Sequence, residues 1–367
     1  MPSTVYFANL RARTVQDNKT NKVLRLFDAA DLGNVLGEND LTAIKLHFGQ
    51  PGSDCFIRPV FVRAVVDRIR EHQAEPFLTD TNTLYAGGRH NGVLHYQVAM
   101  AHGFAYAVVN APVIIADGLR DESVASVDVN LKRFKQVKIA GAIDRADSMI
   151  VMSHFKGHEL AGFGGAIKNL AMGCAPPIGK REQHNVRFIV NEETCIACGE
   201  CEAICPEGAA TVEDKASISN DLCIGCGECY IHCPEKAVQL DWRTDVPEFM
   251  ERMTEYAYGA VKNKLGKVGY INFLMDVTPD CDCLGWSDAP IVRDIGILAS
   301  TDPVALDQAS LDLVNQQAGL DGTHLGCNLG CGEDKFSGLW SHTRGSIQLS
   351  YGEEIGLGSR EYTLEEI

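Results

Sequence analysis

Two cysteine runs constrain this chain more than any other feature. Residues 195–206 read CIACGECEAICP and residues 223–234 read CIGCGECYIHCP, so the pattern C-x2-C-x2-C-x3-C-P occurs twice. Thiolates at these intervals wrap three corners of a cubane from one tight loop, and the fourth cysteine of each run serves the other cluster. Zinc sites rarely take four cysteines at this spacing twice. The spacing therefore predicts two [4Fe–4S] clusters.

Crossed ligation assigns each cluster three cysteines from one run and one from the other. Residues 191–241, which contain both runs, carry eleven acidic and two basic residues, a local charge of −9. Negative surroundings disfavour the reduced cluster, so we expect low reduction potentials. The acidic face is either a docking site for a basic redox partner protein or a solvated surface. The predicted ligand sets are Cys195, Cys198, Cys201 and Cys233 for one cluster, and Cys223, Cys226, Cys229 and Cys205 for the other.

The composition narrows the class of protein further. The chain has 367 residues, of which 45% are apolar, and this length predicts two or three domains. A formal net charge of −16 repels phosphate backbones and anionic lipids, so nucleic acid is not the expected partner. We see neither a basic and apolar leader nor an apolar run near the roughly 20 residues that span a bilayer. We expect a soluble cytoplasmic protein, and its oligomeric state is left open.

Outside the cysteine runs, short apolar segments alternate with helical patterns, as in α/β proteins. Their continuous apolar character indicates buried strands of a mostly parallel sheet. The expected strands are 42–48, 76–80, 148–155, 268–276 and 294–300, and the expected helices are 58–73 and 302–315. We divide the chain into a first α/β part, a ferredoxin-type insertion and a second α/β part, at 1–190, 191–241 and 242–367.

Polar side chains follow the five expected strands. Ligands of open α/β sheets bind beyond the carboxyl ends of the strands. The first strand delivers Lys45 and His47, the second ends in Asp80, and the fifth leads into Ser300 and Asp302. We therefore expect all five strand ends to surround one pocket for a small anionic substrate or cofactor.

The third strand leads into SHFKGHELAGFGGAIKNLAMGCA, residues 153–175. Glycines before a helix present N–H groups that bind phosphate or carboxylate, and Lys168 would add a charge beside Gly164 and Gly165. The alternative is a tight turn between strand and helix. His154, His158 and His184 bracket the turn, and each is suited to bind a metal or carry a proton near neutral pH. These histidines and Lys168 are the candidate catalytic and cofactor-binding residues.

Over nearly its whole length the chain resembles domain-of-unknown-function family 362. The resemblance rests on TDTNTLYAGGRHN, VIIADG, the 153–175 stretch, the inserted cysteine runs, CDC and DIGILASTDPVALDQAS. It implies an iron–sulfur protein whose reaction is unsettled.

A second resemblance is local, because HELAGFGGAIK is similar to a block of the lactate racemase family. That resemblance implies a shared fold and a nickel-pincer nucleotide on Lys168. It also implies that His184 binds nickel, that His158 moves the substrate proton, and that His90 is the counterpart of a second acid–base histidine. A redox-neutral racemase has no need of iron–sulfur clusters.

Four further cysteines form two pairs, C-x-C and C-x3-C. They are either a third metal site with soft thiolate ligands or ordinary buried thiols. The pairs are Cys281 with Cys283, and Cys327 with Cys331.

The sequence is compatible with three functions. The first is an oxidoreductase in which the clusters pass single electrons to or from the His/Lys pocket, and the second is a ferredoxin-type redox partner without turnover. The third is a racemase-like enzyme with a metal or nucleotide-type cofactor at Lys168.

Overall fold

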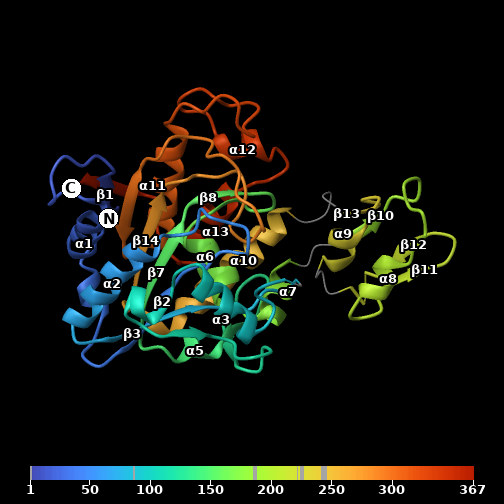
Figure 1. Cartoon of the computed structure of the whole chain (residues 1–367), viewed down its shortest axis with the longest axis horizontal. Helices are drawn as coiled ribbons and strands as arrows, with labels where there is room; N and C mark the ends of the chain where they lie inside the picture. The colour runs from blue at the N-terminus through green and yellow to red at the C-terminus, as the bar shows by residue number, and fades with distance from the viewer. Residues whose placement is uncertain (1, 86, 185–187, 221, 224–226, 241–245) are drawn as a thin grey trace.

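The computed structural model describes residues 2–85, 87–184, 188–220, 222–223, 227–240 and 246–367. A large body built on one sheet and a small lobe beside it make up the molecule (Figure 1). Cys226 of the second predicted ligand set lies outside the described residues.

The large body is organised by an eight-stranded mixed sheet with the order β16-β1-β15-β14-β7-β2-β3-β4. The five strands from β14 to β4 are parallel, which confirms the mostly parallel α/β prediction. All five strands expected from the apolar runs are present. The sheet strands are β1 (Ser3–Asn9), β2 (Leu41–Lys45), β3 (Glu75–Asp80), β4 (Val113–Ile115), β7 (Ser148–His154), β14 (Val268–Leu274), β15 (Gly296–Ser300) and β16 (Tyr362–Glu366).

Strand β15 corrects the expectation that five strand ends surround one pocket. It pairs antiparallel with β14 on one side and with β1 on the other. Its carboxyl end therefore points away from the ends of β2, β3, β7 and β14. Ser300 bonds to the carbonyl of Thr4, and Asp302 caps the following helix through the N–H groups of Val304 and Ala305. These residues stabilise the fold at the opposite edge of the sheet.

Side chains that alternate along the strands pack into two apolar cores, one on each face of the sheet. In β7, Met149 and Val151 join one core, while Ile150 and Met152 join the other. The second core is covered by α1 (Lys19–Ala29) and α2 (Pro59–Glu71), with α3 (Gly92–Ala101), α4 (Tyr106–Val109) and the 3-10 turn Leu32–Val35 near its edge. The first core is covered by α6 (Ala166–Cys174), α10 (Val246–Val261), α11 (Pro303–Asn315) and α13 (Ser346–Glu354).

Shorter elements complete the large body. A β-hairpin of β8 (Lys156–His158) and β9 (Gly162–Gly164) joins β7 to α6, and α7 (Pro177–His184) follows α6. A second hairpin pairs β5 with β6. The remaining elements are β5 (Val124–Asp128), β6 (Gln136–Ala140), α5 (Gly141–Arg145), the 3-10 turn Lys262–Lys264 and α12 (Lys335–Leu339).

The small lobe, residues 188–240, contains the cysteine runs and is called the cysteine lobe below. It has its own core, in which buried cysteines pack with Phe188 and Val238. Two small antiparallel sheets pair β10 with β13 and β11 with β12. Its elements are β10 (Phe188–Val190), α8 (Glu200–Ile204), β11 (Ala210–Val212), β12 (Ala216–Ile218), α9 (Glu228–His232) and β13 (Val238–Leu240).

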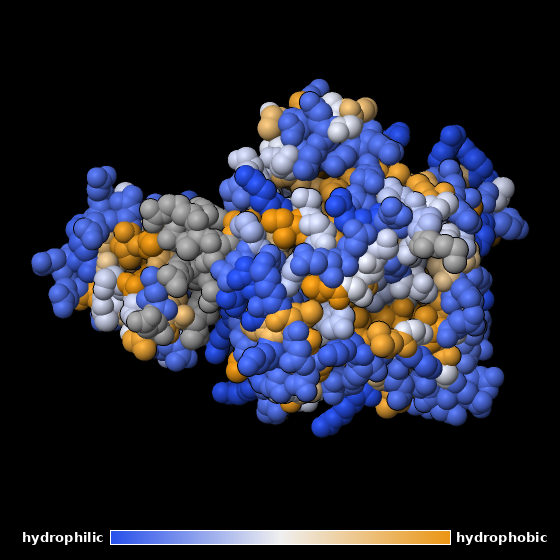
Figure 2. Space-filling model, turned by 180° about the vertical axis from the view of Figure 1, so that it is seen from behind, coloured by the Kyte–Doolittle hydropathy of each residue, from blue (hydrophilic) through white to orange (hydrophobic). Residues whose placement is uncertain are grey.

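The surface seen from behind is mostly hydrophilic, with apolar patches over the lower part of the large body (Figure 2). Among the described residues, no helix combines the length and apolar character needed to cross a membrane.

Candidate functional site

A small pocket lies where the parallel strands end, in the large body. Its volume is about 50 Å³, and the stretch 153–175 forms much of its wall. Such convergence of polar groups at strand ends is where α/β proteins bind ligands. The lining residues are His47, Ile57, Met152, Ser153, His154, Lys156, Gly165, Lys168, Asn169, Met172, Gly173, Cys281 and Asp282.

Lys45 and Asp80 form a buried ion pair directly behind this wall. The Lys45 Nζ lies 3.0 Å from Asp80 Oδ1 and 2.7 Å from Asn169 Oδ1. Burial opposes ionisation of Asp80, but Lys45 together with His95 and His47 outweighs it, and the pKa of that carboxyl lies well below its usual range. Gly173 is required here, because a Cβ at this position would overlap the Lys45 ammonium. The pair therefore fixes α6 against β2 and β3.

The glycine turn before α6 binds an anion that belongs to the chain itself. The N–H groups of Ala166 and Ile167 donate to the carboxylate of Asp307, at 2.8 and 2.9 Å. Asn272 Nδ2 donates to the same carboxylate at 2.7 Å. These donors are the ones expected to hold a phosphate or carboxylate ligand at Gly164 and Gly165, and a side chain from α11 already occupies them. Burial raises the pKa of Asp307 to about 6.

Both ring nitrogens of His154 make hydrogen bonds within the protein. Its Nδ1 lies 2.9 Å from Asp282 Oδ1, and its Nε2 lies 3.0 and 2.9 Å from the carbonyls of Met275 and Asp276. Because both nitrogens face acceptors, the ring is an imidazolium. Burial opposes this charge, but Asp282 outweighs it and raises the pKa of His154. His154 therefore anchors the loop that carries Asp282, rather than shuttling a proton.

Cys281 and Cys283 lie on either side of Asp282 and face Lys168 and His158. The Lys168 Nζ is 3.6 Å from Cys281 Sγ. A ring nitrogen of His158 and the two sulfurs all lie within 4.8 Å of one another. The hydrogen bond from Cys283 lowers the pKa of Cys281 well below its usual range, and Lys168 adds to this effect. The same bond, with burial, raises the pKa of Cys283.

Glu159 places a carboxyl near these thiols. Its Oε2 is buried and, within the described ranges, has no hydrogen-bond partner. Burial, with the nearby Cys281, raises the pKa of Glu159 to about 7.

The remaining predicted histidines are dispersed. His47 lines the pocket and is held neutral, because burial lowers its pKa well below the usual value. His184 packs on Phe249 with ring centroids 5.3 Å apart and does not line the pocket. His90 is exposed and bonds to the carbonyl of Gly87. Of the expected unit of His158, Lys168 and His184, only Lys168 lines the pocket. Burial and the nearby charge of Lys168 lower the pKa of both histidines, and His90 stands apart from the three residues.

The second cysteine pair lies elsewhere. Cys327 and Cys331 are exposed and, in the part of the chain that the structure describes, do not join the group of His158, Cys281 and Cys283. A single site of all four cysteines is not assembled.

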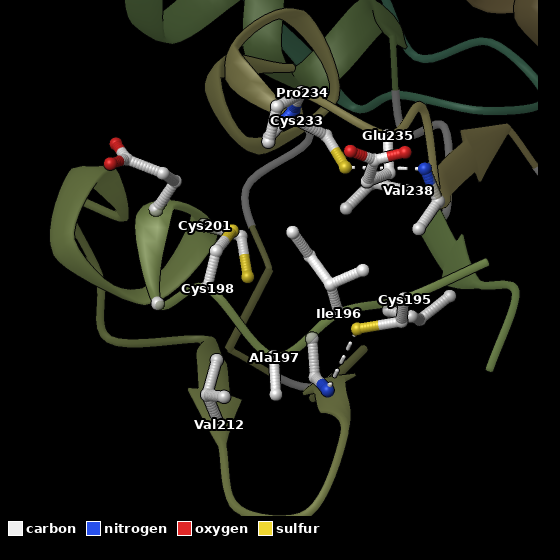
Figure 3. Close-up of a pocket in the computed structure, with 15 residues that line it drawn as sticks. Cys195, Ile196, Ala197, Cys198, Cys201, Val212, Cys233, Pro234, Glu235 and Val238 are labelled. Atoms are coloured by element: carbon white, nitrogen blue, oxygen red, sulfur yellow. Dashed lines mark hydrogen bonds between the residues drawn. The ribbon is translucent and has the colours of Figure 1, made fainter.

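The cysteine lobe contains a second pocket, and its lining matches one predicted ligand set. Cys195, Cys198 and Cys201 from the first run line it together with Cys233 from the second. Figure 3 shows these sulfurs facing a common space into which Ile196 also points. The structure thus brings the four cysteines of the first predicted set to one pocket.

Backbone N–H groups in the lobe point at sulfur atoms. Ala209 donates to Cys205 and Ala237 donates to Cys233, both at 3.2 Å, so the two runs repeat one local structure. Ala216 donates to Cys195 at 3.5 Å, and this bond lowers the pKa of that thiol. Gly199 precedes α8 with φ +84°, a conformation that glycine adopts without strain. Such donors favour thiolates, the form that binds a metal or cluster.

Sequence reasoning missed several residues that shape the pocket. Asn169, Asp282 and Asp307 reach their partners across more than 100 positions of the chain. Only Asp282 carried a local signal, as a carboxylate between two cysteines. Glu159 lies within the 153–175 stretch but was hidden among its histidines and lysines.

These observations define a mixed α/β protein with a buried polar pocket and a cysteine-rich lobe. The chain belongs to the family described as domain of unknown function DUF362, whose model matches residues 42–312. No curated protein matches it.

Two solved structures are similar to this chain. One is the lactate racemase apoprotein from Thermoanaerobacterium thermosaccharolyticum, with 13% identity and a TM-score of 0.39 over 74% of this chain and 51% of that one. The other is a protein from Thermotoga maritima, with 9% identity and a TM-score of 0.35 over 78% of this chain and 57% of that one. The chain therefore spans little more than half the length of either.

Proposed function

We propose that this protein is an iron–sulfur oxidoreductase in which two [4Fe–4S] clusters exchange single electrons with the His/Lys-lined pocket. The observation that carries the proposal is the lining of the lobe pocket, where Cys233 joins Cys195, Cys198 and Cys201. This set is the one that crossed ligation requires. Cys205, Cys223, Cys226 and Cys229 would hold the second cluster.

The residues of the lobe fit such a group. Three N–H groups already donate to ligand sulfurs, and donors of this kind stabilise thiolates and tune reduction potential. When bound, the clusters supply one-electron transfer. The acidic charge of 191–241 suits a basic redox partner protein.

We assign residues 191–241 to an inserted domain whose chain ends approach the pocket. The chain enters the lobe after α7 and returns in α10, and α10 packs against both α6 and α7. Helix α6 carries Lys168. The insertion point is therefore one helix away from the pocket.

The pocket residues have distinct tasks in this proposal. Lys168 and Lys156 supply positive charge to a small anion in a site largely shielded from water. Burial and these two lysines lower the pKa of His158 well below its usual value, so its ring is neutral. The Lys45–Asp80 pair keeps the wall in place rather than contacting substrate.

The test compares two lysine variants in protein purified without oxygen. Lys168→Met removes the pocket charge, and Lys135→Met removes an exposed lysine of the β5–β6 turn. Both should retain about eight iron atoms per chain. After reduction of the clusters, we expect a panel of small anionic acceptors to reoxidise the Lys168 variant at least about tenfold more slowly than the control, which is about 1.4 kcal/mol of barrier.

The alternatives predict other results. Equal reoxidation of both variants would contradict the proposal and favour a redox partner without turnover. A mass attached to Lys168, accompanied by nickel, would instead favour the racemase-like enzyme. Absence of iron in freshly prepared protein would contradict both iron–sulfur functions.

A further inference from the structure

The loop that carries Cys281 and Cys283 is fixed from several sides. The N–H of Gly157 donates to the carbonyl of Thr278 at 2.8 Å, and the Tyr85 hydroxyl donates to the carbonyl of Cys283 at 2.9 Å. A Cβ at Gly157 would overlap the carbonyl oxygen of Pro279, so glycine permits this approach. The His154–Asp282 pair holds the residue between the two cysteines. The two sulfurs therefore sit in a preformed arrangement.

The ring of His158 is poorly prepared to bind a metal beside these sulfurs. Its Nδ1 already accepts hydrogen bonds from the N–H groups of Leu160 and Ala161, at 3.1 and 3.0 Å. A neutral ring with Nδ1 as acceptor carries its proton on Nε2. Neither nitrogen therefore offers a free lone pair, although one of them lies within 4.8 Å of both sulfurs. The lysine ammonium 3.6 Å from Cys281 also opposes a cation there.

The same surroundings suit a thiolate. Lys168 offers N–H donors and a positive charge at Cys281, which is how proteins activate a cysteine. The two cysteines differ in position, because Cys281 is buried and lines the pocket, whereas Cys283 is half-buried and is not part of the lining. The Cys281 sulfur is therefore placed to contact a ligand in the pocket, and the Cys283 sulfur is placed to react with the Cys281 sulfur.

We propose that Cys281 and Cys283 are a redox-active dithiol that reduces a small disulfide in the pocket. The Cys281 thiolate attacks one sulfur of R–S–S–R, which forms a mixed disulfide and releases one R–S⁻. Cys283 then attacks the Cys281 sulfur, an S–S bond forms between the two cysteines, and the second R–S⁻ leaves. The substrate gains two electrons from the two sulfurs, and the Cys283 proton together with one proton from water gives two R–SH.

A disulfide across one intervening residue closes a small, strained ring, and strained disulfides are the easily reduced ones. Two electrons and two protons restore the dithiol. The reaction with a disulfide stands independently of the clusters. Only the supply of these electrons by the clusters rests on the proposed function.

The experiment uses the full chain with its clusters, without oxygen, and the small 2-hydroxyethyl disulfide as the probe. Peptide masses report which cysteines become linked. We expect a Cys281–Cys283 disulfide in the parent protein and a 2-mercaptoethanol adduct on Cys281 in Cys283→Ser. In Cys281→Ser, an adduct at residue 283 should form at least tenfold more slowly. Cys327→Ser is the matched control, because it removes a thiol outside the pocket and should leave the linkage unchanged.

Two results would overturn the dithiol. One is that Cys281 reacts no faster than the buried Cys174. The other is that one equivalent of Co²⁺ binds to both thiols and blocks the reaction until a chelator is added.

A second arm tests the clusters as the electron source. The Cys281–Cys283 disulfide is supplied with electrons through a one-electron viologen donor. Return of both thiols in the parent but not in Cys233→Ser supports delivery through the clusters. Equal return of the thiols in both proteins overturns delivery through the clusters and leaves the result with 2-hydroxyethyl disulfide standing, so the two proposals fail separately.

Discussion

The chain uses cysteine in two contrasting environments. In the cysteine lobe, sulfurs accept backbone N–H bonds and gather around a shared space. In the large body, Cys281 lies against the Lys168 side chain with Cys283 beside it, and the nearby histidine has no free lone pair. Backbone donors stabilise a thiolate without competing for a metal, whereas an ammonium opposes a cation. Groups of cysteines suited to bind a cluster and groups suited to react as thiols therefore differ in what surrounds the sulfur atoms, not in how many cysteines they contain.

The largest expected effect is loss of a whole cluster from the lobe. Cys233→Ser and Cys205→Ser should each lower the iron content from about eight to about four atoms per chain. Crossed ligation predicts that adding Cys195→Ser to Cys233→Ser removes no further iron, whereas adding Cys229→Ser removes the rest. Elemental analysis measures both, and Cys174→Ser is the control. The opposite pattern of double variants would show that each run binds its own cluster.

The next effect concerns the ion pair that holds the thiol loop. Asp282→Asn leaves the His154 imidazolium buried without its anion, which should cost about 3 kcal/mol of unfolding free energy. Because the pairing raises the pKa of His154, its contribution is present at low pH and lost as pH rises through that raised value. The cost measured by urea unfolding should therefore be greater at pH 6 than at pH 9. A cost equal to that of the exposed Asp288→Asn would contradict this role.

A smaller effect is expected at the start of α6, which carries Lys168. Asp307→Ala leaves the N–H groups of Ala166 and Ile167 unpaired and should cost about 2 kcal/mol. The pKa of Asp307 is about 6 in the folded protein, above its ordinary 3.8. The carboxyl therefore stabilises the fold fully below pH 3.8, and this contribution is lost as pH rises through 6.

Thermal unfolding at two pH values checks the role of Asp307. The difference between parent and Asp307→Asn should be larger at pH 5 than at pH 7.5. A difference independent of pH would mean that the carboxyl is ionised throughout this range.

The smallest effect sharpens the contrast between the two kinds of cysteine. Lys168→Met should raise the pH midpoint of Cys281 alkylation by about one unit, which corresponds to 1.4 kcal/mol. The rate of iodoacetamide labelling, followed by peptide mass, measures this shift in a Cys283→Ser background. Lys135→Met should leave the midpoint unchanged, and neither variant should lose iron. An unchanged midpoint in Lys168→Met would remove the lysine from the activation of the thiol.

Local patterns could be read from the sequence, and distant contacts could not. Continuous apolar runs identified β7 and β14, and the helical pattern of 302–315 identified α11. The direction of β15 was missed, because an apolar run does not indicate in which direction its strand runs. The connection to the preceding strand decides whether the pairing is parallel or antiparallel. The two cysteine runs could be recognised because the spacing within each run is local. The Asp307 contact with Ile167 joins residues 140 positions apart, and no periodic pattern reports it.

Pairing of the two chain ends has a practical consequence for electrical measurements. Strands β1 and β16 run side by side, and both termini lie at the end of the molecule away from the cysteine lobe (Figure 1). A tag at either end would attach the protein to an electrode with the lobe facing the solution. Current would then have to arrive through a dissolved mediator, whereas coupling through an exposed lobe residue such as Glu207→Cys would bring the cysteine runs next to the metal surface.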